Sequence, residues 1–325
     1  MRPQPLSVKI LIMSFIVETS YFGNFTQADD PKITVIPCPY EYTPSIVKGT
    51  KNGPQAILNA STHLEKFDDE LWTGTSIIGI NTTNFLNCEY VTNKSKEPFS
   101  EVEQAVRNTI IGGSLPILIG GEQSISFGSI KTIYDLYPDV SILYFSARPC
   151  LKDIHAHNKY SSPCTMRRIH EIMPDLKIIQ AGIRSISEEE ANWVEGNTTS
   201  IEIFFAKDKN KWSVTDLISN LTKNVFICFN FNALDSNYMP SCSFPEPGGL
   251  SYELVLDILK NVCAFKDIVG MDFVECAPNL NLQAPDLLAA KLIYKTIGYT
   301  FARQLGVFEE EKDLQPATSS NILCE

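Results

Sequence analysis

At 325 residues with 44% apolar and 20% charged side chains, the chain is long enough to bury a large hydrophobic core. Its net charge of −11 and isoelectric point near 5.0 argue against nucleic acid as a partner, because phosphate binding needs a basic face. Attraction to an anionic membrane surface is disfavoured for the same reason.

The N-terminal residues 1–20 differ in character from the rest of the chain. Arg2 and Lys9 precede a short apolar run at residues 10–17, with no clean small-residue cleavage site after it. We expect residues 1–20 to be a signal-like or disordered extension. The apolar run is too short to span a bilayer. No repeat or linker divides residues 21–305, which we expect to form one domain, followed by a C-terminal tail at 306–325.

Short apolar runs alternate with helix-like stretches along residues 21–305. Continuous apolar strands bounded by polar segments indicate a parallel sheet that is buried on both faces. We therefore expect an α/β protein with three α/β/α layers and a mainly parallel sheet of about eight strands. The expected strands are residues 33–36, 76–80, 115–119, 141–145, 177–180, 202–205, 224–229 and 267–272. The expected helices are residues 54–66, 100–111, 125–137, 187–194, 252–261 and 285–304.

Three segments at the ends of expected strands carry polar residues. They read PILIGGEQS at 116–124, ILYFSARPCL at 142–151 and FNFNALDS at 229–236. Ligand sites in parallel sheets form at such carboxyl ends. These segments resemble the GGDHS, DAHxD and DxDxxDP motifs of the ureohydrolase superfamily, the arginases and agmatinases.

The resemblance extends from about residue 21 to about residue 303. Residues 40–43 and 48–57 are similar to the N-terminal pattern of the agmatinase-like branch. Residues 180–185, 244–250 and 268–275 match the family in order and spacing. The resemblance implies the arginase-like fold and descent from an enzyme that hydrolyses a linear amidine to urea and an amine.

All six positions that hold two manganese ions in this family carry other residues. The resemblance places them at Gln123, Ser146, Arg148, Cys150, Asn230 and Asn232. Hard divalent ions need carboxylates or imidazoles, whereas Gln, Asn and Ser offer neutral oxygens and Arg offers no lone pair. We expect no bound metal here, and therefore no metal-activated water. The alternative of a misaligned loop would require three motifs to be misread in the same direction.

Other family positions are altered or retained in ways that bear on ligand binding. Ser162 occupies the position of a catalytic His, so no catalytic residue is expected. Glu275 matches a carboxylate that contacts the substrate guanidinium, and Asp235 is the surviving third acid of DxDxxDP, so both are candidates for residual ligand binding. Arg148 is expected to replace the lost cations electrostatically, by pairing with Glu122, Asp235 or Glu275, or else to point to solvent.

Two cysteines flank a His-x-His pattern in residues 150–164. Cys150, His155, His157 and Cys164 could in principle form a tetrahedral zinc site, although the spacing matches no closed zinc motif. The two cysteines could instead form a disulfide in an oxidising compartment.

Three functions remain open from the sequence. The favoured one is a catalytically inactive pseudoenzyme that binds a small guanidino or amine ligand, as a homo-oligomer (trimer or hexamer) or as a hetero-oligomer with an active paralogue. The second is an active agmatinase-type amidinohydrolase with an unrecognised metal site. The third is a structural or interaction protein with a filled pocket. No nucleic acid or membrane partner is expected.

The compartment is predicted from weak signals. Six Asn-x-Ser/Thr sequons and the signal-like run leave a secretory route open. Nine cysteines form no framework-like spacing, and the resemblance points to a mostly intracellular family, so a cytoplasmic location is favoured.

Overall fold

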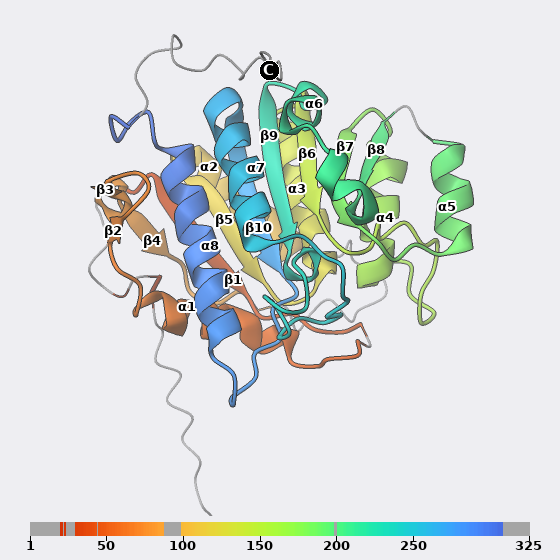
Figure 1. The fold of residues 1–325 in the computed structure, drawn as a ribbon, viewed down its shortest axis with the longest axis horizontal. Coiled ribbons are helices and arrows are strands. Elements are labelled where there is room, and N and C mark those ends of the chain that lie inside the picture. The colour runs from red at the N-terminus through yellow and green to blue at the C-terminus, as the bar shows by residue number, and fades with distance from the viewer. Residues whose placement is uncertain are drawn as a thin grey trace, which may run out of the picture.

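The structure, a computed structural model, describes residues 20–21, 23, 30–43, 45–87, 99–197 and 200–307. The expected N-terminal extension, apart from residue 20, and the tail from residue 308 lie outside the described residues. The described chain forms an eight-stranded sheet with helices on both faces, and a separate two-stranded ribbon of β2 (Phe67–Asp68) and β3 (Thr73–Gly74) (Figure 1). The expected α/β architecture with three layers is confirmed.

The strand order in the large sheet is β4-β1-β5-β10-β9-β6-β7-β8, and every neighbouring pair is parallel. The carboxyl ends of all eight strands therefore share one edge. The strands are β1 (Ile33–Cys38), β4 (Ile80–Thr82), β5 (Leu115–Gly120), β6 (Val140–Phe145), β7 (Lys177–Ile183), β8 (Ile201–Phe205), β9 (Asn224–Asn230) and β10 (Asp267–Val274).

One strand prediction is corrected by the structure. Residues 76–80 were expected to be extended, but Thr75–Ile78 form a 3-10 helix and the edge strand β4 begins only at Ile80. Short apolar runs do not distinguish a strand from a helical turn by periodicity alone, because both bury consecutive apolar residues.

Helices cover the two faces of the sheet in separate groups. On one face lie α1 (Gly53–Ser61), α6 (Val214–Ser219), α7 (Tyr252–Phe265) and α8 (Ala284–Thr300), and on the other lie α2 (Ser100–Ile111), α3 (Ser126–Leu136) and α4 (Thr165–Ile172) (Figure 1). The eight-residue α5 (Glu188–Glu195) packs Trp193 and Val194 against the second group's core. Helices α4 and α6, of eight and six residues, were absent from the sequence prediction.

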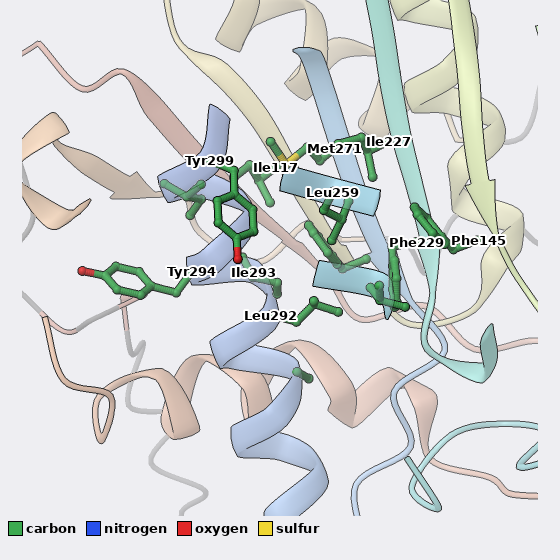
Figure 2. Packing of buried hydrophobic residues seen from close by; sticks show 14 of the residues in the cluster. Ile117, Phe145, Ile227, Phe229, Leu259, Met271, Leu292, Ile293, Tyr294 and Tyr299 are labelled. Atoms are coloured by element: carbon green, nitrogen blue, oxygen red, sulfur yellow. The ribbon is translucent and has the colours of Figure 1, made fainter. Parts of the chain in front are cut away.

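Alternate strand residues enter two hydrophobic cores. In β5, Ile117 and Ile119 belong to the core under α1, α7 and α8, whereas Leu118 belongs to the core under α2 and α3. Figure 2 shows the first core, with Leu259 of α7 and Ile293 of α8 packed near strand side chains. Burial of each Leu or Ile side chain stabilises the fold by about 1.5–3 kcal/mol. Because both faces of the sheet are buried, consecutive residues of these strands are apolar. No helix among the described residues combines the length and apolarity needed to cross a bilayer.

Candidate functional site

The altered motifs meet at the carboxyl ends of four adjacent strands. Gln123 lies just after β5, Glu275 directly after β10, Asn230 at the end of β9 and Ser146 directly after β6. These strands are neighbours in the order β5-β10-β9-β6, so side chains that are distant in sequence converge. The segment that follows β9 lies over this edge, at the bottom of the view in Figure 1.

Two glycines allow the loop after β5 to approach its neighbours. A Cβ atom on Gly121 would lie 1.8 Å from the carbonyl oxygen of Tyr40, and one on Gly120 would lie 2.0 Å from Ile125. Neither position therefore accepts a side chain without displacement of the backbone or core. This close approach brings Glu122 and Gln123 to the site together with the segment around Tyr40.

The side-chain amides of Gln123 and Asn230 bind each other. Asn230 Nδ2 donates to Gln123 Oε1 at 3.0 Å, and Gln123 Nε2 donates to Ser126 Oγ at 2.8 Å and to Cys228 Sγ at 3.2 Å. Gln123 is fully buried and Asn230 is 2% exposed. The hydrogen bonds offset the cost of burying these amides, which would otherwise be several kcal/mol.

Asn232 joins this pair to the loop after β6. Its backbone N–H donates to Asn230 Oδ1 at 3.0 Å. Its own Oδ1 accepts from Ala147 N at 2.9 Å and from Ser146 Oγ at 3.2 Å. Gln123, Asn230, Asn232 and Ser146 therefore form one connected polar network, called the amide cluster below.

The amide cluster does not fit a pair of divalent cations. Its four residues supply no anionic oxygen, and the side-chain oxygens of Gln123, Asn230 and Asn232 already accept hydrogen bonds. Such ions need carboxylate ligands to offset their charge. Within the described ranges, no group of three or more His, Cys, Asp or Glu side chains is arranged to hold a metal ion. The absence of manganese at the six positions therefore stays a prediction that rests on their donor chemistry.

Carboxylates remain on the side of the site nearest β5 and β10. Glu275 Oε1 accepts from Gln123 N and from Ser162 Oγ, each at 2.7 Å. Glu122 accepts from Thr43 Oγ1 at 2.9 Å and from the backbone N–H groups of Thr43 and Tyr42. Ser162, at the position of the family's catalytic His, also donates its backbone N–H to Thr43 Oγ1 at 3.0 Å. Glu122, Glu275, Ser162 and Thr43 are called the carboxylate cluster below.

Glu275 is the least satisfied member of the carboxylate cluster. Its buried Oε2 meets no donor with hydrogen-bond geometry, although the Ser243 hydroxyl, which has no other partner, lies close enough to lower the pKa of this carboxyl. Burial raises the pKa of Glu275 to about 7, with the neighbouring charge of Glu122 adding to the increase, while the Ser243 and Ser162 hydroxyls oppose it. The backbone of Glu275 has φ 70°, a left-handed conformation that costs energy in a residue with a side chain. A strained, unsatisfied carboxyl at a strand end is typical of a binding site.

Glu122 differs from Glu275 because its donors are more numerous. Burial also raises the pKa of Glu122, but hydrogen bonds from Ser124, Thr43 and Tyr42 oppose the increase. Both oxygens of Glu122 are occupied. Glu275 is therefore the member of this pair that keeps one buried oxygen without a donor of hydrogen-bond geometry.

The prediction for Arg148 is wrong. Its guanidinium does not pair with Glu122, Asp235 or Glu275, and it does not point freely to solvent. It donates to Glu246 Oε1 from Nη2 at 2.9 Å and lies over the ring of Phe244, 3.8 Å from the ring centroid. The sequence missed this clamp because Phe244 and Glu246 lie almost a hundred residues away, in a loop whose path depends on the tertiary fold.

Asp235 binds its own loop. Its carboxylate accepts from the backbone N–H groups of Gly248 at 2.6 Å and Gly249 at 2.9 Å, and from Asn237 N at 3.0 Å. These backbone hydrogen bonds lower its pKa, although burial opposes the change. A Cβ atom on Gly249 would lie 2.5 Å from the backbone nitrogen of Asp235, so the loop needs glycine there.

The cysteine and histidine pattern of residues 150–164 is not brought together as a zinc site or a disulfide. Cys150 and Cys164 are free, with the Cys150 sulfur bound by Tyr144 Oη at 3.2 Å and the Cys164 sulfur 3.3 Å from Ser161 Oγ. Burial raises the pKa of Cys150 above its ordinary range and raises that of Cys164. Neither thiol is activated as a nucleophile or ligand by these surroundings.

A small pocket opens beside this site. It has a volume of about 200 Å³ and is lined in part by Arg148, Cys150, Lys152, Ser185 and Glu190. Glu190 is the N3 residue of a capping box at the start of α5, and it also accepts from Leu151 N at 3.0 Å. The pocket is thus bounded by the loop after β6, which carries three of the six altered positions and contributes two of them, Arg148 and Cys150, to the lining.

Comparison with known proteins assigns most of the chain to one protein family. The model of the arginase family matches residues 31–298. The chain is 30% identical over 287 residues to the N(1)-aminopropylagmatine ureohydrolase of a Synechocystis species, covering 84% of this chain and 90% of that protein. It is 26% identical to the agmatinase of Pyrococcus horikoshii, covering 83% and 92% of the two chains. The agmatine ureohydrolase structure of Thermoplasma volcanium superposes with a TM-score of 0.76 at 25% identity, over 85% and 92% of the chains.

These relatives contradict the expectation of a catalytically inactive protein. Several proteins that match across most of this chain carry the names of enzymes, ureohydrolases of the agmatinase type. The sequence interpretation took the loss of one set of ligands as the loss of the reaction, an inference that the residues alone do not support. Substituted ligands exclude one way of activating water at those positions, and they do not by themselves exclude the reaction.

Proposed function

Because the chain belongs to the arginase family, we propose that it is an amidinohydrolase of the agmatinase type, which adds water to a linear amidine and releases urea and an amine. Support comes from the family match over residues 31–298 and from relatives named as aminopropylagmatine ureohydrolase and agmatinase. The proposed substrate class is a guanidino compound that carries an amine at its other end.

The observation that carries the proposal is the free Oε2 atom of Glu275. A guanidinium presents paired N–H donors in a plane, and a carboxylate is the acceptor that matches them. Oε2 is buried without a partner, whereas Oε1 is held by Gln123 N and Ser162 Oγ. A cationic amidine would satisfy this oxygen and offset the charge of the carboxylate cluster.

The same carboxyl group has a proton affinity suited to acid–base chemistry. With its pKa near 7, Glu275 exchanges a proton readily near neutral pH. In the proposed reaction, Glu275 accepts a proton from the water whose oxygen attacks the amidine carbon. It then returns this proton to the amine nitrogen as the C–N bond breaks. The hydroxyl left on the carbon gives its own proton to the same carboxyl, which forms the carbonyl of urea, and the carboxyl passes that second proton to the released amine.

Two manganese ions would supply a more acidic water and a Lewis acid in this family, but the amide cluster offers them no anionic ligand. We therefore propose that turnover by this chain needs no metal at Gln123, Ser146, Arg148, Cys150, Asn230 and Asn232. Without that activation, we expect urea release to be slow compared with metal-dependent members of the family.

Urea release from agmatine and from N(1)-aminopropylagmatine tests the proposal. Full-length protein is assayed with added Mn²⁺, and separately after dialysis against EDTA. We expect slow urea release in both arms. The absence of urea from either substrate in both arms would overturn the proposed function. Release that occurs only with Mn²⁺ would preserve the function and overturn its metal independence.

Paired variants of β10 and its end test the role of Glu275. Glu275→Gln is expected to remove urea release. The matched control is Asp272→Asn in β10, a buried carboxyl that also has one oxygen without a partner while the other accepts from Ser129 Oγ at 2.9 Å, in the core under α2 and α3. Activity that survives in Glu275→Gln at the wild-type rate would contradict the role of this residue.

A further inference from the structure

Two cysteines face each other beside the site. Cys242 lies in the segment that follows β9, and Cys276 follows Glu275 at the end of β10. The two residues form an isolated antiparallel bridge. The two short segments therefore pair with each other at these two cysteines.

The backbone hydrogen bonds around the bridge define its type. Ser243 N donates to Glu275 O at 3.1 Å, and Ala277 N donates to Ser241 O at 2.9 Å. Both bonds join residues on either side of Cys242 and Cys276, so the cysteines themselves form a non-hydrogen-bonded pair. In such a pair the Cα atoms are roughly 4.5 Å apart and the side chains project to the same side.

This pairing meets the main requirement for a disulfide. A disulfide needs Cα atoms about 4.4–6.8 Å apart and Cβ atoms that point toward each other. Both cysteines are fully buried and belong to the same hydrophobic core. Charge repulsion between the two sulfurs also contributes to raising the pKa of Cys276, after burial and the effect of Asp286, which is consistent with their proximity.

We propose that Cys242 and Cys276 are a dithiol that closes to a cross-strand disulfide when a small disulfide oxidant of the glutathione class is present. The two thiols lose two protons and two electrons and form one S–S bond, and the oxidant leaves as two thiols. This inference does not depend on the proposed function, since it concerns a covalent bond that either outcome of the urea assay permits.

The chemistry indicates when the bond forms. Burial raises the pKa of Cys242 to about 12, so little thiolate is present in the folded protein at neutral pH. Exchange therefore proceeds mainly while the chain is folding, before the pair is covered. Once formed, the bond stabilises the fold, because it restricts the unfolded chain between the two cysteines.

The proposed disulfide would join two residues that are each adjacent in sequence to a residue of the site. Cys242 precedes Ser243, whose hydroxyl lies near Glu275, and Cys276 follows Glu275 directly. A covalent link between them would hold the strained backbone of Glu275 against the loop that carries Phe244 and Glu246. The disulfide therefore connects the oxidation state of this pair to the rigidity of the mouth of the site.

The experiment uses full-length protein in glutathione buffers of increasing oxidised fraction. One sample is equilibrated in the folded state, and a second is refolded from urea in the same buffers, so that the thiols are accessible. Free thiols are alkylated and the protein is digested without reduction for mass spectrometry. We expect a linked Cys242–Cys276 peptide to accumulate with oxidised glutathione, more rapidly in the refolded sample, together with a rise of several degrees in Tm.

Variants assign the effect to this pair. Cys242→Ser and Cys276→Ser should each remove both the linked peptide and the Tm difference between oxidised and reduced samples. The matched control is Cys263→Ser, a buried thiol 3.5 Å from Thr300 Oγ1, which should retain both. Full alkylation of Cys242 and Cys276 in both samples at the most oxidising ratio would overturn the proposal, as would linkage of either cysteine to a different partner.

Discussion

The amide cluster and the carboxylate cluster, the two halves of the strand-end site, differ in how their buried polar groups are hydrogen-bonded. The amide cluster is neutral, and the side-chain oxygens of Gln123, Asn230 and Asn232 all accept hydrogen bonds from within it. The carboxylate cluster, a few residues away on β5 and β10, retains two buried acids and leaves Glu275 Oε2 without a partner. The oxygens of the first half are satisfied within the protein, whereas the second half keeps one buried oxygen without a donor of hydrogen-bond geometry.

This difference shows where function can reside. A self-satisfied amide network contributes to stability and specifies the packing of the strand ends, because each member would be costly if left unpaired. A buried carboxylate with an open oxygen reduces stability when it is charged, and such a cost is characteristic of sites that bind or react. We therefore expect changes in the carboxylate cluster to affect the reaction and changes in the amide cluster to affect folding.

The largest effect is expected from Glu275→Gln, which should abolish urea release and at the same time stabilise the protein at pH 8. The pKa of Glu275 is raised from 4.5 to about 7, so the folded state binds its proton more tightly than the unfolded state. Its contribution to stability is present below pH 4.5 and is lost as the pH rises through 7. The loss at pH 8 is about 3 kcal/mol.

Thermal unfolding of wild type and Glu275→Gln between pH 4 and pH 9 measures this contribution. The stability difference between the two proteins should grow in favour of the variant from pH 4.5 to pH 7 and then level off. A difference that stays constant across the range would show that Glu275 has an ordinary pKa.

Asn230→Asp is expected to destabilise the protein by about 3 kcal/mol at neutral pH. It replaces the Nδ2 donor, which lies 3.0 Å from Gln123 Oε1, by an oxygen that faces the same acceptor, and it buries a charge without a cation. Urea unfolding gives the magnitude, with the exposed Asn237→Asp as the control. Added Mn²⁺ should not restore the lost stability. Recovery with stoichiometric Mn²⁺ would show that the amide cluster accepts a metal after one substitution.

Asn232→Ala is expected to cost about 2 kcal/mol, without a direct effect on Glu275. The substitution leaves the N–H of Ala147 and the hydroxyl of Ser146 without their acceptor. Urea unfolding should show the loss, while the affinity for agmatine, measured by calorimetry, should change little. A large fall in affinity with unchanged stability would reverse the division of roles between the two clusters.

The smallest effect on stability, about 1 kcal/mol, is expected from Arg148→Ala. Both partners of the Arg148–Glu246 pair are partly exposed, with 29% and 25% of their side-chain surfaces accessible, so the ion pair is worth little, and the contact with Phe244 adds a similar amount. Loss of the clamp should loosen the loop over the site and increase the association rate of agmatine a few-fold.

The control for Arg148→Ala is Arg107→Ala, which removes an exposed pair with Asp135 at 3.0 Å on the opposite group of helices. Stopped-flow binding should show no change for this control. An association rate that is equal in both variants and in wild type would indicate that the Arg148 clamp does not limit access.

Much of the fold was predictable because burial on both faces leaves a strong local signal. The runs that became β5, β6, β9 and β10 were correctly expected to be strands, since continuous apolar residues there leave no solvent-facing side. The edge strand β4 was misplaced, because a sheet edge imposes fewer constraints on its sequence. Helix α4 was missed although its apolar residues recur at helical spacing, and α6 was missed because its six residues make fewer than two turns.

For the site, the sequence predicted which residues lie at the strand ends but not which atoms bind one another. The resemblance of the motifs to known patterns identified Gln123, Asn230, Asn232 and Glu275, and the parallel sheet placed them at one edge. The bond between Gln123 and Asn230, 107 residues apart, could not be read from either motif. The partner of Arg148 was predicted incorrectly for the same reason, because charge alone does not indicate which of several acids a guanidinium reaches.

The amino-acid sequence by itself determined the layered α/β architecture and the chemistry of the donors at the strand ends. These properties depend on residue type and on local periodicity, which are present in the unfolded chain. Only the tertiary structure decided which polar atoms became partners, which oxygen of Glu275 stayed free and which two cysteines came to face each other. Those outcomes depend on distances of a few ångströms between segments far apart in the chain, and packing alone sets such distances.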